Sequence, residues 1–120
     1  MITFKTVKFC FLLIFVFFNI FYTLPSYSLP LREDLFKNAL DLSSGGKFNL
    51  ALEEWDQYLA SYPDDAAGLS NRGNVRLVMG DLDGSIDDQN KPISLNPSEI
   101  DPYINRGIAE EALGLWSKAK

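Results

Sequence analysis

The stretch AAGLSNRGNVRLVMGDLDGSIDDQNKPISLNPSE, residues 66–99, decides the fold, because its skeleton recurs before and after it at a spacing of 34 residues. The tripeptide Asn71-Arg72-Gly73 returns as Asn105-Arg106-Gly107. Other small and rigid residues repeat at the same interval: Gly46, Gly80 and Gly114, and Pro63 and Pro97. A period of this length is typical of helix-turn-helix solenoids, in which each repeat packs against its neighbours. The sequence therefore predicts a repeat protein.

These residues resemble the pattern of the tetratricopeptide repeat (TPR) family, which has characteristic residues at repeat positions 4, 8, 17, 20, 24 and 32. In residues 32–65 those positions hold Leu35, Ala39, Phe48, Ala51, Trp55 and Pro63. In residues 66–99 they hold Leu69, Gly73, Leu82, Ser85, Gln89 and Pro97. Residues 100–120 supply only Tyr103, Gly107, Trp116 and Ala119. The resemblance implies an all-α fold, a right-handed solenoid of antiparallel helix pairs with two full TPR units and a truncated third.

Apolar spacing and stop signals predict helices over residues 31–42, 47–62, 66–79, 82–95 and from Asp101 to about residue 113. We expect Asp64 or Asp65, Asp81 and Asp101 to act as N-caps. Ala51 and Gly73 are predicted to be small crossing points between paired helices. Repeat-packing roles are also expected for Gly46, Trp55, Pro63, Gly80, Pro97, Gly107, Gly114 and Ala119.

Two features depart from the family pattern. Pro92 lies inside the fourth predicted helix, where a proline removes a backbone hydrogen bond at a cost of about 3 kcal/mol. We therefore expect a kink between Asp88 and Pro92. Gly114 is predicted to end the fifth helix, and residues 116–120 to begin a sixth that stops early. One interpretation is a truncated sequence or the front of a longer protein, and the alternative is a complete product.

The first 28 residues differ in kind from the rest. Lys5 and Lys8 precede the apolar run of residues 9–24, and Ser26 and Ser28 are small residues before Leu29. This arrangement is typical of a signal peptide cleaved before Leu29. The alternative is an N-terminal membrane anchor, although sixteen residues fall short of the roughly 20 that span a bilayer. We expect an exported protein, in a periplasm, a lumen or outside the cell, with residues 29–120 as the TPR domain. In the alternative, residues 9–24 anchor it to the membrane, which is the only membrane contact expected.

Little in the sequence points to chemistry. The chain has no histidine, and its single cysteine, Cys10, lies in the segment that cleavage would remove. All sixteen acidic residues and nine of the eleven basic ones lie beyond residue 28, so that part has a net charge of −7. Its bases are scattered, which disfavours nucleic acid as a partner. The acidic pairs, such as Asp87-Asp88, are interpreted as solvated faces or caps. Asp81-Leu82-Asp83-Gly84 has its glycine too early for a calcium loop. We expect no enzyme activity, no metal and no cofactor.

The resemblance also implies a concave groove, lined by the first helix of each repeat, that binds a protein or peptide segment. By repeat position the groove residues are Phe36, Leu40, Ser70, Asn71, Asn74, Leu77, Val78, Ile104, Asn105 and Ile108. The large apolar members are expected to form a floor, and the asparagines to bind a peptide backbone. The subclass that grips a chaperone's C-terminal carboxylate uses a Lys, Asn and Arg set, of which only Asn71 is present. Arg72 and Arg106 are interpreted as partners of acids across the repeat interface.

Two functions fit these observations. The first is an exported TPR scaffold that binds a peptide or protein segment in its groove and assists the assembly of a complex. The second is purely structural, with these repeats as the N-terminal support of a longer TPR protein and no independent ligand. The partner's identity does not follow from the residues.

Overall fold

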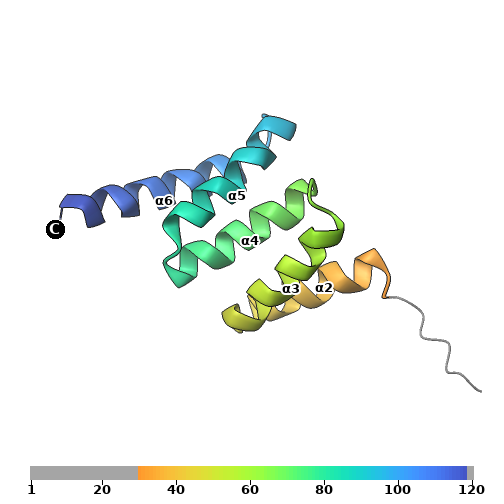
Figure 1. The fold of residues 1–120 in the computed structure, drawn as a ribbon. Helices are drawn as coiled ribbons and strands as arrows, with labels where there is room; N and C mark the ends of the chain where they lie inside the picture. Colours follow the sequence, from red (N-terminus) through yellow and green to blue (C-terminus); the bar gives the residue numbers. More distant parts are fainter. Residues whose placement is uncertain (1–29, 119–120) are drawn as a thin grey trace, which may run out of the picture.

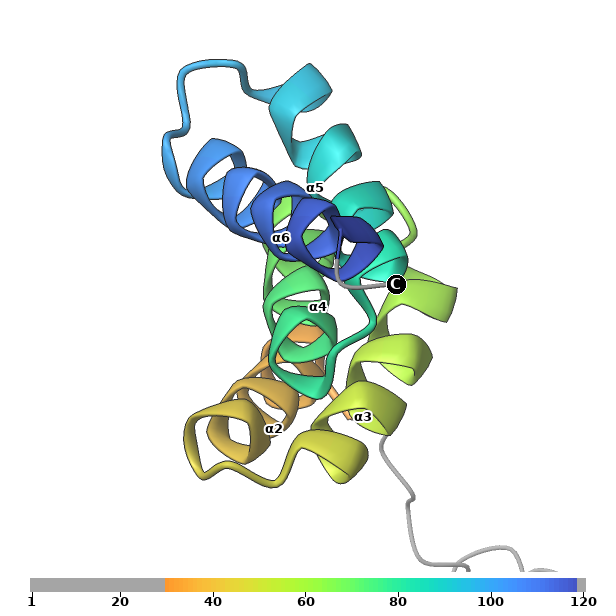
Figure 2. The same ribbon diagram turned by 90° about the vertical axis from the view of Figure 1, so that its left-hand side faces the viewer.

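The computed structural model describes residues 30–118 and builds this part of the chain from helices alone. The helices are α2 (Arg32–Ser44), α3 (Phe48–Ser61), α4 (Ala66–Met79), α5 (Leu82–Leu95) and α6 (Asp101–Lys118). Each helix packs against the next one along the chain (Figure 1). Figure 2 shows α2, α4 and α6 stacked in one layer, with α3 and α5 beside them in a second. The predicted all-α solenoid of helix pairs is confirmed.

Local signals set the bounds of α4 and α5, which are the predicted ones. The side chain of Asp65 accepts a hydrogen bond from the backbone N–H of Gly68, and Asp81 accepts one from Gly84. Both aspartates thereby satisfy backbone donors that a helix leaves unpaired in its first turn. Gly80 ends α4 with a φ of 85°, a left-handed conformation that suits glycine. The predicted caps of these two helices are confirmed.

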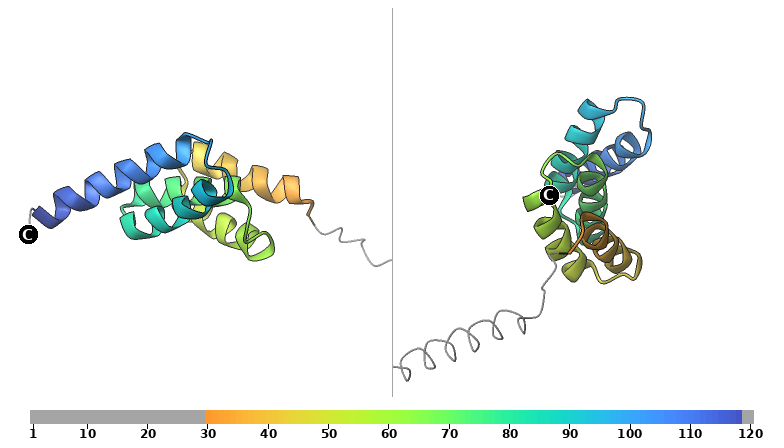
Figure 3. Two further views of the ribbon diagram at one scale, coloured as in Figure 1. Left: turned by 90° about the horizontal axis from the view of Figure 1, so that it is seen from above. Right: turned by 90° about the vertical axis from the view of Figure 1, so that its right-hand side faces the viewer.

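Helix α6 differs from the prediction at both ends. It begins at Asp101, so Asp101 is its first residue instead of its N-cap. Gly114 does not end it, because α6 runs on to Lys118 (Figure 3). The sixth helix expected from residue 116 onward is therefore wrong for residues 116–118. Unlike Gly46 and Gly80, Gly114 has no positive φ, and no neighbour within 4 Å would meet a side chain there. A glycine alone does not stop a helix when nothing packs beside it to hold a turn.

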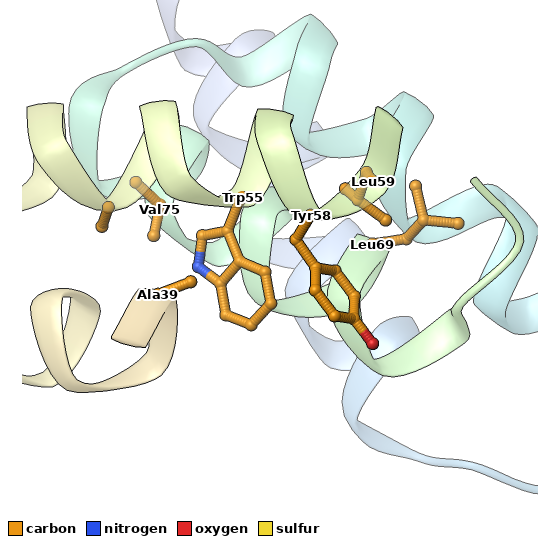
Figure 4. Packing of buried hydrophobic residues seen from close by; sticks show 7 residues of the cluster. Ala39, Trp55, Tyr58, Leu59, Leu69 and Val75 are labelled. Carbon is orange, nitrogen blue, oxygen red and sulfur yellow. The ribbon is translucent and has the colours of Figure 1, made fainter. Parts of the chain in front are cut away.

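The first helix pair packs around an aromatic core. Its buried members are Ala39, Ala51, Trp55, Tyr58, Leu59, Leu69 and Val75 (Figure 4). Ala39 and Ala51 have no exposed surface, which lets α2 and α3 approach closely. The ring of Phe36 packs edge-on against Trp55 at a centroid distance of 5.0 Å and against Tyr58 at 5.4 Å. Phe36 was predicted to line the groove, and that prediction is wrong because its ring completes this core.

A network of polar side chains ties the core to the start of α4. The buried hydroxyl of Tyr58 donates to Asp65 at 2.7 Å and accepts from Arg32 at 2.9 Å. Arg32 also forms an ion pair with Asp65 at 3.2 Å. Burial raises the pKa of the Tyr58 phenol. The three residues come from α2, α3 and the N-cap of α4, so the network joins the first repeat to the second.

The interface between α4 and α5 is polar where the first pair is aromatic. The carboxylate of Asp88 accepts two hydrogen bonds from Arg72, at 2.8 and 2.7 Å, and a third from Arg76 at 2.9 Å. Asp88 is only 4% exposed, so its interpretation as a solvated residue is wrong. Two guanidinium groups one helical turn apart supply the partners that a buried carboxylate requires.

Arg72 also reaches back to the first repeat, where it pairs with Asp56 of α3 at 2.8 Å. The hydrogen bonds from Asp88 raise the pKa of Arg72 further above its ordinary value. The prediction that Arg72 pairs with acids across the repeat interface is confirmed. Arg106 differs from it: it donates to Asn90 at 3.0 Å across the interface, while its acidic partner, Glu110, lies in its own helix at 3.5 Å.

Gly73 marks the crossing of α4 and α5. A Cβ atom at this position would lie 2.6 Å from Nε2 of Gln89 and 3.1 Å from Cβ of Asp88. Any larger residue would push the two helices apart, because such distances are well inside van der Waals contact. Pro92 follows on the same side of α5 and is buried, and the helix continues beyond it to Leu95. The kink expected between Asp88 and Pro92 stays a prediction.

Replacing Asp88 should destabilise the fold strongly. Asp88→Ala leaves the guanidinium groups of Arg72 and Arg76 without their shared partner, and such losses cost about 3–5 kcal/mol. The neighbouring Asp87 is exposed, so Asp87→Ala should change the free energy of unfolding by no more than about 0.5 kcal/mol. Urea unfolding followed by circular dichroism would measure both variants. Equal effects of the two substitutions would contradict the role given to Asp88.

Pro92→Ala should raise the melting temperature. The substitution restores the backbone bond to Asp88, a gain of about 3 kcal/mol in helix propensity. It removes two buried ring carbons, at a loss of about 0.8 kcal/mol for each. The net effect favours the folded state. Ser94→Ala, an exposed change in the same helix, serves as the control, and a melting temperature of Pro92→Ala at or below that of the parent chain would refute the expectation.

Candidate functional site

A cavity of about 530 Å³ lies where the start of α4, the end of α5 and the start of α6 meet (Figure 1). Its walls come from all three helices and from the loop that joins α5 to α6. The lining residues are Ala66, Ala67, Ser70, Asn71, Asn74, Pro92, Asn96, Glu99, Asp101, Pro102 and Asn105. The cavity therefore lies at the junction of the second and third repeats.

Amide side chains dominate the walls, and the helices hold several of them in place. Ser70, Asn71 and Asn74 share one face of α4 because they are one and four residues apart. The Nδ2 group of Asn71 donates to the carbonyl of Ala67 at 2.9 Å. Buried Gln89 of α5 donates to the carbonyl of Ser70 at 3.0 Å and to Oδ1 of Asn74 at 3.4 Å. Asn74 is thus oriented from behind, and its NH₂ group remains a donor.

Four of the predicted groove residues meet in this cavity: Ser70, Asn71, Asn74 and Asn105. The predicted apolar floor does not form in it, since Leu40, Leu77, Val78, Ile104 and Ile108 are all absent from its walls. Leu77 is half-buried, and the other four are exposed. Leu40, Ile104 and Ile108 occupy the repeat positions of Ser70 and Asn74 on the neighbouring helices. They extend the same layer of first helices on either side of the polar cavity.

Several lining residues were not selected from the sequence as groove residues. Pro92, Asn96, Glu99 and Pro102 complete the walls. Pro92 stood out only as a helix breaker, at a repeat position normally held by a small residue inside the second helix. Its ring instead closes one side of the cavity. The other three lie in or beside the α5–α6 loop, where the helical pattern carries no information about which way a side chain points.

The predicted packing residues divide into two groups. Ala51, Trp55 and Gly73 are buried at helix contacts, and Gly46 and Gly80 take positive φ at helix ends. Pro63 and Pro97 lie exposed in the loops after α3 and α5. For Gly107 and Gly114 a packing role is wrong within residues 30–118, because nothing lies within 4 Å of a Cβ placed at either. Ala119 lies outside the described residues.

The cavity is acidic. Glu99 and Asp101 belong to its walls, which contain no lysine or arginine. Asn96 donates to Oε1 of Glu99 at 3.1 Å, which leaves the second carboxylate oxygen of Glu99 free of that bond. Both carboxylates lie at the N-terminal end of α6, where the helix dipole favours negative charge. An anionic ligand group would meet repulsion here, whereas neutral hydrogen-bonding groups would not.

Two further searches cover only the described part of the chain. Within residues 30–118, no group of three or more metal-binding side chains is arranged to hold an ion. No helix in that range is both long enough and apolar enough to cross a membrane.

Comparisons with known proteins agree with the repeat architecture. No protein-family model matches the chain. It is 30% identical over 88 residues to sperm-associated antigen 1 of Homo sapiens, covering 72% of this chain and 10% of that protein. It is 28% identical over 81 residues to the TPR repeat-containing thioredoxin TDX of Arabidopsis thaliana, covering 68% of this chain and 21% of that protein. The chain thus spans only about a tenth and a fifth of the length of these relatives.

The matched regions cover more than two thirds of this chain, so they include most of its helical pairs. The name of the Arabidopsis relative states that it carries TPR repeats. The helix pairs and their 34-residue period lead to the same description. The chain is an all-α solenoid of TPR-like helix pairs, an architecture typical of modules that interact with proteins.

Proposed function

We propose that this protein binds an extended segment of another protein or peptide across α4 and α6, with the backbone of that segment at the polar cavity. The observation that carries the proposal is the convergence of Ser70, Asn71, Asn74 and Asn105 on one cavity. Asparagine side chains offer a donor and an acceptor each, which is what an extended backbone needs at every peptide unit. Exposed Leu40, Ile104 and Ile108 supply apolar surface for side chains on either side.

The electrostatics of the cavity select among peptide ligands. With Glu99 and Asp101 in its walls and no base beside them, the cavity disfavours a free C-terminal carboxylate. An internal segment of a longer chain suits it better, because the peptide groups of such a segment are neutral. The chaperone tails bound by some TPR proteins are consequently not proposed as ligands.

Site-specific photo-crosslinking from Asn74 in the native, full chain tests this proposal. The matched control places the same crosslinker at Asn49, an exposed asparagine of α3 outside the cavity. We expect a discrete adduct from position 74 that is absent from position 49 and that is lost when Asn105 becomes Leu. Equal adducts from both positions, or an adduct that survives Asn105→Leu in a chain of unchanged helicity, would contradict binding at the cavity.

We also propose that the protein is exported, that it assists complex assembly, and that it is not an enzyme. The support for export is the sequence pattern of residues 1–28, which lie outside the described residues. The absence of histidine from the sequence supports a non-enzymatic role. Purely structural support of further repeats is the alternative function, and the exposed face of α6 is the observation that favours it.

Export predicts a specific mature terminus. Cleavage after Ser28 should give a chain that begins at Leu29, which intact-mass spectrometry of the natively expressed protein would detect. Replacing Ser28 by a bulky residue should block cleavage, because signal peptidase sites require small side chains there. A native chain that retains residues 1–28 would rule out the cleaved form and favour the anchored one.

A further inference from the structure

Helix α6 carries, on an uncovered face, the residues through which α4 contacts α5. The tripeptide Asn71-Arg72-Gly73 of α4 recurs as Asn105-Arg106-Gly107 of α6. In α4, α5 covers Gly73, and Nε2 of Gln89 would lie 2.6 Å from a Cβ there. In α6, nothing lies within 4 Å of a Cβ at Gly107 or at Gly114. The same helix surface is thus closed in one repeat and open in the next.

Exposure along α6 agrees with an open face. Tyr103 is 41% exposed, whereas its counterpart Leu69 is 7% exposed. The opposite side of α6 is covered, since Pro102 and Ala109 are buried and Arg106 donates to Asn90 of α5. The C-terminal end of α6 also extends beyond α4 and α5 (Figure 3). One side of this helix therefore packs within the chain, and the other presents Tyr103, Gly107, Glu110 and Gly114.

The charges on this open face differ from those of α4 in one informative way. On α4 both long polar residues are arginines, Arg72 and Arg76, and they require the acid Asp88 of α5. On α6 the second arginine is replaced by Glu110. The open face therefore carries one positive and one negative group a helical turn apart. A surface with this pattern is complementary to an antiparallel copy of itself, which is the requirement of a two-fold symmetric interface.

We propose that the open face of α6 binds the same face of a second copy of this chain, with the two helices antiparallel. Arg106 of each copy then faces Glu110 and Glu111 of the partner subunit. In the register that places Gly107 opposite the partner's Glu110, Tyr103 lies opposite the partner's Gly114. Large residues meet small ones at both ends of the contact, and the glycines let the helices approach closely.

The groups needed for these contacts are available. The ion pair of Arg106 with Glu110 inside α6 is long, at 3.5 Å, and the two side chains are 31% and 57% exposed. Exposed pairs of this kind contribute little to stability. Both side chains can therefore exchange this contact for one across the interface, where they lose water on both sides. The proposal is independent of the peptide-binding function, which uses a different face of α4 and α6.

Disulfide crosslinking in the full chain tests the contact directly. In a Cys10→Ser background, Gly107→Cys and Glu110→Cys each place a thiol close to the proposed two-fold axis. The matched control is Lys37→Cys, an exposed position on α2. We expect rapid dimer formation on oxidation for positions 107 and 110 and little for position 37. Equal yields at all three positions would overturn the proposal, because they would indicate association without a defined face.

Charge reversal provides the second test and does not depend on cysteine. Arg106→Glu and Glu110→Arg each place like charges opposite each other in the homodimer, so each variant alone should lose the dimer in sedimentation equilibrium. A mixture of the two variants restores opposite charges at both contacts and should recover the dimer as a heterodimer. Circular dichroism checks that both variants stay helical. Dimerisation of the single variants, or a mixture that remains monomeric, would refute the α6 interface.

Discussion

The carboxylate of Asp88 lies between the guanidinium groups of Arg72 and Arg76, and the arrangement of the second repeat depends on it. A buried charge is tolerated only where its partners are fixed, so α5 has little freedom to slide or rotate against α4. Arg72 also pairs with Asp56, which connects α3 to the same network. Because α5 is held in this register, Pro92 faces the start of α4 and closes one wall of the cavity.

The two helix pairs solve the same packing problem with different chemistry. In the first pair, Trp55 and Tyr58 fill the space between helices with aromatic rings. In the second pair, Gln89 takes the repeat position of Trp55 and is fully buried. An aromatic ring at that position would only fill space, whereas the amide of Gln89 donates to Ser70 and Asn74. The polar interior of the second repeat thus orients the side chains of the proposed peptide site.

The layer of first helices presents two distinct surfaces. One includes the polar cavity at the start of α4 and α6, with exposed leucine and isoleucine residues around it. The other is the open face of α6, where Arg106 and Glu110 alternate with glycines. The first suits an extended peptide and the second suits another helix, because extended chains need hydrogen-bonding groups while helices satisfy their own backbone and pack by shape. A repeat module with both surfaces can bind a ligand and pair with a copy of itself.

The sequence by itself determined the helical repeat, the bounds and caps of α4 and α5, the small residues at helix crossings and four residues of the cavity. These features follow from local signals, since caps, left-handed glycines and a 34-residue period act over a few residues or repeat by rule. Only the tertiary structure decided the burial of Asp88, the place of Phe36 in the core, the continuation of α6 through Gly114 and the polar walls that replace the apolar floor. Each of these depends on which residues distant in sequence lie beside a position, and neighbours of that kind leave no periodic signal in the chain.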